Sequence, residues 1–92
     1  MKAKIRFFAR FRELFGTDIM AEAAPGTTIL DLIKQVAAKN KDGHDAIFDE
    51  HGAFREFVII MRNTKRVDTA EAGKILITDG DDIAVFPPVA GG

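Results

Sequence analysis

The sequence contains no cysteine. Small secreted domains often need disulfide bonds, so a chain without cysteine fits the cytoplasm, and we expect a cytoplasmic protein. The absence also limits the chemistry of the chain, because any reaction at sulfur must use sulfur that another molecule brings.

Long apolar runs and an excess of charge of either sign are missing as well. No apolar run approaches the roughly 18–20 residues that span a bilayer. Thirteen basic and fourteen acidic residues give a formal net charge of −1, whereas a dedicated nucleic acid-binding domain usually has a clear basic excess. We therefore expect no membrane and no nucleic acid among the partners.

Motifs for catalysis within the chain are absent too. The sequence holds neither of the glycine-rich phosphate-binding patterns, GxxxxGK[ST] and GxGxxG. His44 and His51 have acidic neighbours, but their spacing fits no pattern of metal ligands. The acidic segment 78–82 lacks the ligand order of an EF-hand and is predicted to be a turn. We expect no metal site, no bound cofactor and no catalytic site of the chain's own.

The residues that are present suit one globular domain. The chain has 92 residues, of which 47% are hydrophobic, enough for a single modest core but not for a second one. Charged and apolar residues alternate over 2–8, which predicts a strand. The mainly apolar segment 82–86 predicts another strand, which ends where two prolines follow. Further strands are predicted at 17–24, 57–61 and near Val67, with a short helical turn at 10–15.

One segment has a clear helical pattern. Thr28 and Asp31 resemble a capping box, with Asp in place of the usual Glu or Gln. Apolar residues then recur at the spacing of one helix face: Ile29, Leu32, Ile33 and Val36. We predict one main helix that fades near Asn40. Residues 41–56 are predicted to be an irregular connection, with a short turn of helix at 45–48.

This order of elements predicts an α+β fold. Two hairpins that flank one helix suggest a mixed sheet of about four to five strands wrapped on that helix. The first and last strands must then lie side by side and parallel. We expect this arrangement to place Lys2 and the end of the chain on a common surface.

Alternation in those two strands predicts an aromatic pair. If Ile5 and Phe7 face the helix, then Arg6 and Phe8 point away from it, and the same rule turns Phe86 away. Phe8 and Phe86 would meet on the open face of the sheet, beside Arg6. Such a patch is typical of a docking site for a partner protein; the alternative is that a loop or a register bulge covers the rings.

Basic residues occupy even positions of the opening segment: Lys2, Lys4, Arg6, Arg10 and Arg12. A basic stripe of this kind would suit phosphate or an acidic protein surface, and the default alternative is a solvated face that keeps the domain soluble. The even register is assured only through Phe8.

The last residues, FPPVAGG, predict a tail over 87–92 that follows a domain over 1–86. Each proline holds φ near about −65°, so Pro87 and Pro88 direct the chain away from the sheet. Val89 and Ala90 would extend the tail, and Gly91 and Gly92 have no Cβ, so they fit a channel too narrow for other residues. An ionised terminal carboxylate is a poor electrophile and must be activated before it reacts. Because the chain has no nucleotide-binding motif, we expect another protein to activate it.

Three segments resemble the MoaD/ThiS family of ubiquitin-like β-grasp sulfur carriers, which includes the small subunit of molybdopterin synthase. They are LFGTD at 14–18, TTILDLI at 27–33 and TDGDDIAVFPPVAGG at 78–92. The resemblance implies a ubiquitin-like β-grasp fold and a protein that is not catalytic alone.

The resemblance also implies partners and roles for individual residues. An ATP-dependent activating enzyme would adenylate Gly92, and a sulfur donor protein would convert it to a thiocarboxylate. The molybdopterin synthase large subunit would then receive the tail, and the sulfur would enter the molybdenum or tungsten cofactor. The inserted residues would be Pro87, Pro88, Val89, Ala90 and Gly91, and the partner interface would include Phe8 and Phe86.

Two features depart from compact bacterial members of that family. The stretch 41–56 is longer and looks like that of archaeal-type members, some of which are ubiquitin-like modifiers linked to protein lysines. NTKR at 63–66 replaces a common NG-type turn, and Arg66 stands near an expected apolar interface position. A protein modifier, a thiamine-pathway carrier and a plain binding module therefore stay open as alternatives.

Overall fold

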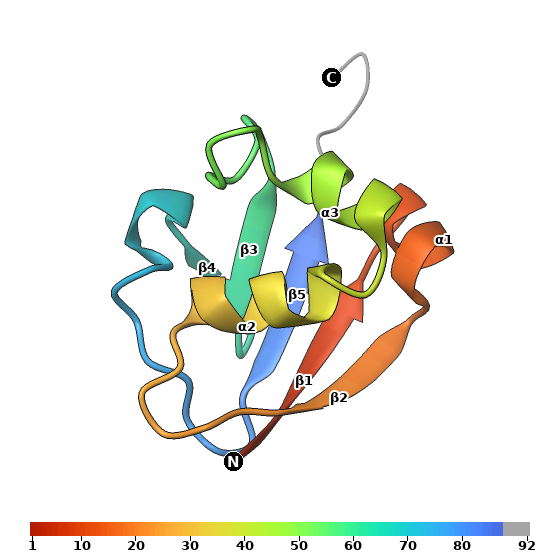
Figure 1. The fold of residues 1–92 in the computed structure, drawn as a ribbon. Coiled ribbons are helices and arrows are strands. Elements are labelled where there is room, and N and C mark those ends of the chain that lie inside the picture. The colour runs from red at the N-terminus through yellow and green to blue at the C-terminus, as the bar shows by residue number, and fades with distance from the viewer. Residues whose placement is uncertain (88–92) are drawn as a thin grey trace.

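The computed structural model describes residues 1–87 of the 92-residue chain. A five-stranded sheet, in the order β2-β1-β5-β3-β4, wraps around helix α2 (Figure 1). The central pair, β1 and β5, is parallel, and the other pairs are antiparallel. The α+β class, the mixed sheet and the parallel first and last strands are therefore confirmed. The elements in chain order are β1 (Lys2–Phe7), α1 (Arg10–Phe15), β2 (Asp18–Glu22), α2 (Ile29–Ala37), α3 (Lys41–Ile47), β3 (Ile59–Arg62), β4 (Lys65–Val67), η1 (Thr69–Glu71, a 3-10 helix) and β5 (Asp82–Phe86).

Helix α2 begins at the capping box that the sequence predicts. The Asp31 N–H donates to Thr28 Oγ1 at 3.1 Å, and the Thr28 N–H donates to Asp31 Oδ2 at 3.3 Å. The helix ends at Ala37, before the expected Asn40, because Asn40 caps the next helix. Its side-chain oxygen accepts a hydrogen bond from the Gly43 N–H at 3.0 Å.

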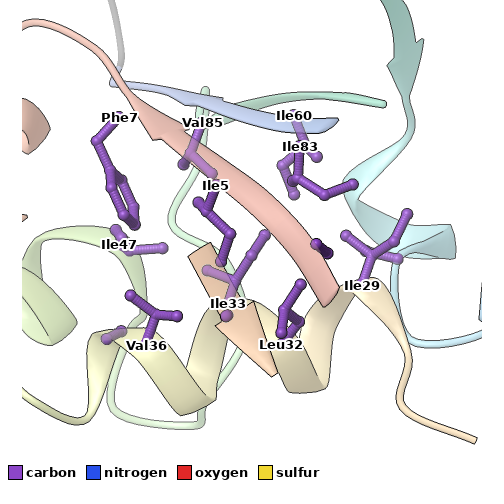
Figure 2. Packing of buried hydrophobic residues seen from close by; sticks show 14 of the residues in the cluster. Ile5, Phe7, Ile29, Leu32, Ile33, Val36, Ile47, Ile60, Ile83 and Val85 are labelled. Atoms are coloured by element: carbon purple, nitrogen blue, oxygen red, sulfur yellow. The ribbon is translucent and has the colours of Figure 1, made fainter. Parts of the chain in front are cut away.

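The hydrophobic core lies between α2 and the sheet. Alternate residues of the central strands point toward α2 and are fully buried, as Figure 2 shows for Ile5, Phe7, Ile83 and Val85. The apolar face of α2 meets them with Ile29, Leu32, Ile33 and Val36. Each buried side chain of this size stabilises the fold by about 1.5–3 kcal/mol relative to an exposed one. The predicted facing of both strands is confirmed.

Residues 41–56 hold more regular structure than predicted. A complete helix, α3, replaces the expected irregular connection with one turn of helix. Gly43 lies against the ring of Phe15 in α1, where a Cβ atom would overlap the ring. The ring of Phe48, directly after α3, packs against the ring of Phe54 with centroids 4.9 Å apart. Tertiary packing therefore stabilises a helix whose sequence, KDGHDAI, has weak intrinsic helix propensity.

Two further expectations about the sheet are wrong. Phe57 is outside the buried strand, because β3 begins at Ile59 and the Phe57 side chain is exposed. Lys2 and Pro87 do not share a surface, because the parallel strands β1 and β5 start at the same end of the sheet and Pro87 follows the other end of β5. The N–H of Lys2 donates to Asp79 Oδ1 at 2.8 Å, whereas Pro87 follows β5 at the opposite end of the strands. The rest of the predicted tail lies outside the described residues.

Within residues 1–87, no helix has the length and apolar character needed to cross a membrane.

Candidate functional site: the open face of the sheet

The rings of Phe8 and Phe86 stack on the sheet face turned away from α2, here called the open face. Their centroids are 4.3 Å apart and their planes differ by 12°. Phe86 is the last residue of β5, and Phe8 directly follows β1, where its N–H donates to the Val85 carbonyl at 3.2 Å. The predicted meeting of the two rings is confirmed. Both residues are half-buried rather than fully exposed, because stacking covers one face of each ring.

Apolar neighbours extend this pair across the sheet. The register of β3 and β5 places Ile59 opposite Phe86 and Met61 opposite Ala84. Directly paired residues of antiparallel strands project to the same side of a sheet, so all these side chains belong to the open face. Each of them is half-buried. The open face therefore has an apolar centre at the end of the sheet where β5 stops.

Charged residues border the apolar centre. Arg6 Nε lies 3.9 Å from Asp18 Oδ1 on β2 and 3.8 Å from Asp82 Oδ1 on β5. All three side chains are more than a third exposed, so these ion pairs add little to stability, and their effect is to orient Arg6 across β1. On the other side, Arg66 of β4 is exposed and lies opposite Met61. Two guanidinium groups thus border the apolar centre from opposite sides.

The predicted basic stripe does not continue beyond β1. Lys4 and Arg6 share the open face, where Lys4 lies between Met20 and Asp82 in register. Arg10 and Arg12 belong to α1 and leave the sheet. The even register ends because Ala9, with a φ of 53°, turns the chain after Phe8 into α1.

Pro87 is the last described residue, and it follows Phe86 directly. Pro88, Val89, Ala90, Gly91 and Gly92 lie outside the described residues. Their roles in insertion and sulfur transfer, and the tail boundary itself, stay predictions.

The sequence pattern does not reveal a buried carboxylate, Asp81, which lies at the opposite end of the sheet, just before β5. The Thr78 N–H donates to Asp81 Oδ2 at 2.8 Å, Asn63 Nδ2 donates to Oδ1 at 3.0 Å, and Arg62 Nη2 lies 3.1 Å from Oδ2. Burial alone would raise the pKa of Asp81, but the hydrogen bonds and Arg62 together hold that pKa below its ordinary value. The acidic run 78–82 is the turn that the sequence predicts. The side-chain partners of Asp81, Asn63 and Arg62, come from β3 and its hairpin turn, and no local pattern indicates them.

Neither the histidines nor the acidic turn assembles into a metal site within residues 1–87, where no group of three potential ligands comes together. His44 Nδ1 lies 3.2 Å from its neighbour Asp45, and His51 Nε2 lies 3.6 Å from its neighbour Glu50. The candidate site consists of the open face and Pro87, which is called the base of the tail because the predicted tail begins there.

A mixed sheet wrapped on one capped helix, with parallel first and last strands, defines a ubiquitin-like β-grasp protein. The fold matches the crystal structure of SAMP1 from Haloferax volcanii with a TM-score of 0.87, at 22% identity and over 100% of both chains. Residues 5–92 match the model of the ThiS family, and the chain belongs to that family.

Two relatives match over nearly their whole lengths. Small archaeal modifier protein 3 of Haloferax volcanii is 33% identical over 93 residues, with 100% of both chains covered. The molybdopterin synthase sulfur carrier subunit of Escherichia coli is 35% identical over 89 residues, with 97% of this chain and 98% of the relative covered. The chain is therefore a small ubiquitin-like member of a family of sulfur carriers and modifiers.

Proposed function

We propose that this chain is a sulfur carrier for molybdopterin biosynthesis, the route to the molybdenum or tungsten cofactor, and that Gly92 carries the sulfur as a thiocarboxylate. The observation that carries the proposal is the family match, which runs through the FPPVAGG ending to residue 92. The similarity to the molybdopterin synthase sulfur carrier subunit supports the pathway.

The chemistry requires activation by another protein. In an ATP-dependent adenylating enzyme, the Gly92 carboxylate attacks the α-phosphorus of ATP and releases pyrophosphate. A persulfide on a sulfur donor protein then displaces AMP and forms an acyl disulfide, and a thiol reduces this disulfide to the thiocarboxylate. The chain has no cysteine to supply sulfur, so it acts as the substrate of these steps, and ATP binds the enzyme rather than the carrier.

The open face would dock each partner while the tail reaches its active site. Phe8 and Phe86 supply an apolar contact, and Arg6 adds an oriented charge beside it. Because Phe86 directly precedes Pro87, the docking contact and the tail belong to one continuous segment. Docking of the face therefore fixes the point from which residues 88–92 enter the partner.

The test is the intact mass of the chain after co-expression with its adenylating enzyme and sulfur donor. We expect a mass increase equal to the exchange of one oxygen for sulfur. A variant that lacks Gly91 and Gly92 is the control, and it should show no increase. An unchanged mass of the full chain, with both partner proteins active, would contradict the proposal.

A protein modifier is the second candidate, favoured by the full-length similarity to a small archaeal modifier protein. In that case a lysine amine of another protein displaces AMP from the adenylate and forms an isopeptide bond. Trypsin cleaves after Lys74, the last basic residue, so a conjugated lysine would carry residues 75–92. The variant Ala90→Arg would shorten this remnant to Gly-Gly, which mass spectrometry detects readily.

A further inference from the structure

Phe57 combines two features that are unfavourable for a phenylalanine. Its side chain is 72% exposed, and its φ of 69° lies in the left-handed region that side chains with a Cβ disfavour. The residue lies in a turn over 55–58, which the Val58 N–H closes by donating to the Arg55 carbonyl at 3.2 Å. Glycine or asparagine suits such a position better. A strained and exposed aromatic residue at a turn points to a role outside the fold itself.

The turn lies at the base of the tail. The register of β3 and β5 pairs Ile59 with Phe86. The residues before Ile59 therefore lie at the same end of the strands as Pro87. Phe57 therefore lies at the end of the sheet that also carries the apolar centre of the open face. In Figure 1 this is the end of the sheet toward which the arrow of β5 points, opposite the N-terminus.

The two other large exposed apolar residues in the described chain lie elsewhere. Met20 belongs to β2, at the outer edge of the sheet. Leu76 forms a bridge with Thr28, next to the start of α2. Among these three, Phe57 alone adjoins the base of the tail.

The length of the tail limits how far a partner can stay from Phe57. Residues 88–92 span at most about 18 Å when fully extended, at roughly 3.6 Å per residue. A protein that takes the Gly92 carboxylate into an enclosed active site must therefore bring the mouth of its channel close to Pro87. Phe57 lies at the same end of the sheet as Pro87.

We propose that Phe57 is a docking residue for the adenylating enzyme, and that its ring fills an apolar pocket beside the channel that receives residues 88–92. This inference rests on the proposed activation of Gly92. It names the adenylating enzyme because both the sulfur carrier and the protein modifier must pass through that step. Burial of an aromatic anchor at the centre of an interface is a common source of binding energy.

The test is ATP–pyrophosphate exchange catalysed by the purified adenylating enzyme, with the full-length chain as the varied substrate. Phe57→Asn removes the ring and suits the left-handed backbone, so the variant should unfold at the same temperature as the wild type or higher. We expect its KM to rise about 10- to 30-fold, as for an interface anchor, with kcat little changed. Phe57→Tyr should retain a KM near that of the wild type.

Leu76→Asn is the matched control, because it removes a similarly exposed apolar side chain far from the tail. Its KM should stay that of the wild type. An unchanged KM for Phe57→Asn would overturn the assignment of Phe57 while leaving the proposed function intact. A second result would also overturn the assignment: the wild type is a dimer, and Phe57→Asn makes it a monomer without changing the KM. The ring would then bind a second copy of the chain rather than the enzyme. If the wild-type chain supports no exchange, both proposals fail.

Discussion

Phe7 and Phe8 are adjacent aromatic residues on opposite faces of the sheet, and their truncation should separate stability from docking. Each ring stacks on another ring, Phe7 on Phe15 at 4.5 Å and Phe8 on Phe86 at 4.3 Å. Phe7 is fully buried in the core, so Phe7→Ala should lower the free energy of unfolding by about 3–5 kcal/mol. Phe8 is half-buried, so Phe8→Ala loses about 1 kcal/mol of burial and about 0.5–1.5 kcal/mol of stacking.

Urea unfolding measures both variants under the same conditions. A domain of this kind has about 5–15 kcal/mol of stability in total, so Phe8→Ala, which costs about 2 kcal/mol, should remain folded with an unchanged m-value. In the ATP–pyrophosphate exchange assay, Phe8→Ala should raise the KM of the carrier. The reasoning is refuted if Phe8→Ala destabilises the fold as much as Phe7→Ala. An unchanged KM for a folded Phe8→Ala variant would remove the open face from the docking proposal.

Two further variants probe the opposite edge of the sheet. The lowered pKa of Asp81 means that its stabilising effect is complete above the unfolded pKa of about 3.9 and is lost as pH falls through the lower folded value. Asp81→Asn should therefore lower the free energy of unfolding by about 1.5–3 kcal/mol at pH 7. Urea unfolding at several pH values should show this difference from the wild type shrinking in acid, and a difference that stays constant would contradict the prediction. Thr64 has a φ of 72° in the β3–β4 turn, so Thr64→Gly should raise the free energy of unfolding by about 0.5–1 kcal/mol, and a loss of stability would mean that the turn is unstrained.

The helix and the central strands were predictable because local rules determine them. A capping box and one apolar stripe define α2, and strict alternation defines the faces of β1 and β5. The meeting of Phe8 and Phe86 followed from alternation together with parallel pairing. The same pairing excludes a common surface for Lys2 and Pro87, because parallel strands begin at one end of the sheet and finish at the other.

The missed features depend on contacts between segments distant in sequence. Helix α3 has a glycine and few strong helix formers, and it is stabilised by packing of Gly43 on Phe15. Phe57 precedes an apolar run and resembles the start of a strand, whereas its exposure depends on a backbone angle that no side-chain pattern reports. Asp81 lies in a predicted turn, but the Asn63 and Arg62 groups that bind it come from β3 and the turn that follows.

The position of β5 in the sheet explains how a short tail can be presented with a defined origin. β5 has a paired strand on each side, so its backbone is held by β1 as far as Val85 and by β3 as far as Phe86. At the start of β5, Asp81 ties the chain to Asn63 and Arg62, and the Asp82 N–H donates to Asn63 Oδ1 at 2.9 Å. A partner that docks on the Phe8–Phe86 pair therefore meets Pro87 at a preset place and direction. A docking surface that is already ordered lowers the entropic cost of association, and under the proposed function this suits a chain that binds several enzymes in turn and leaves each of them.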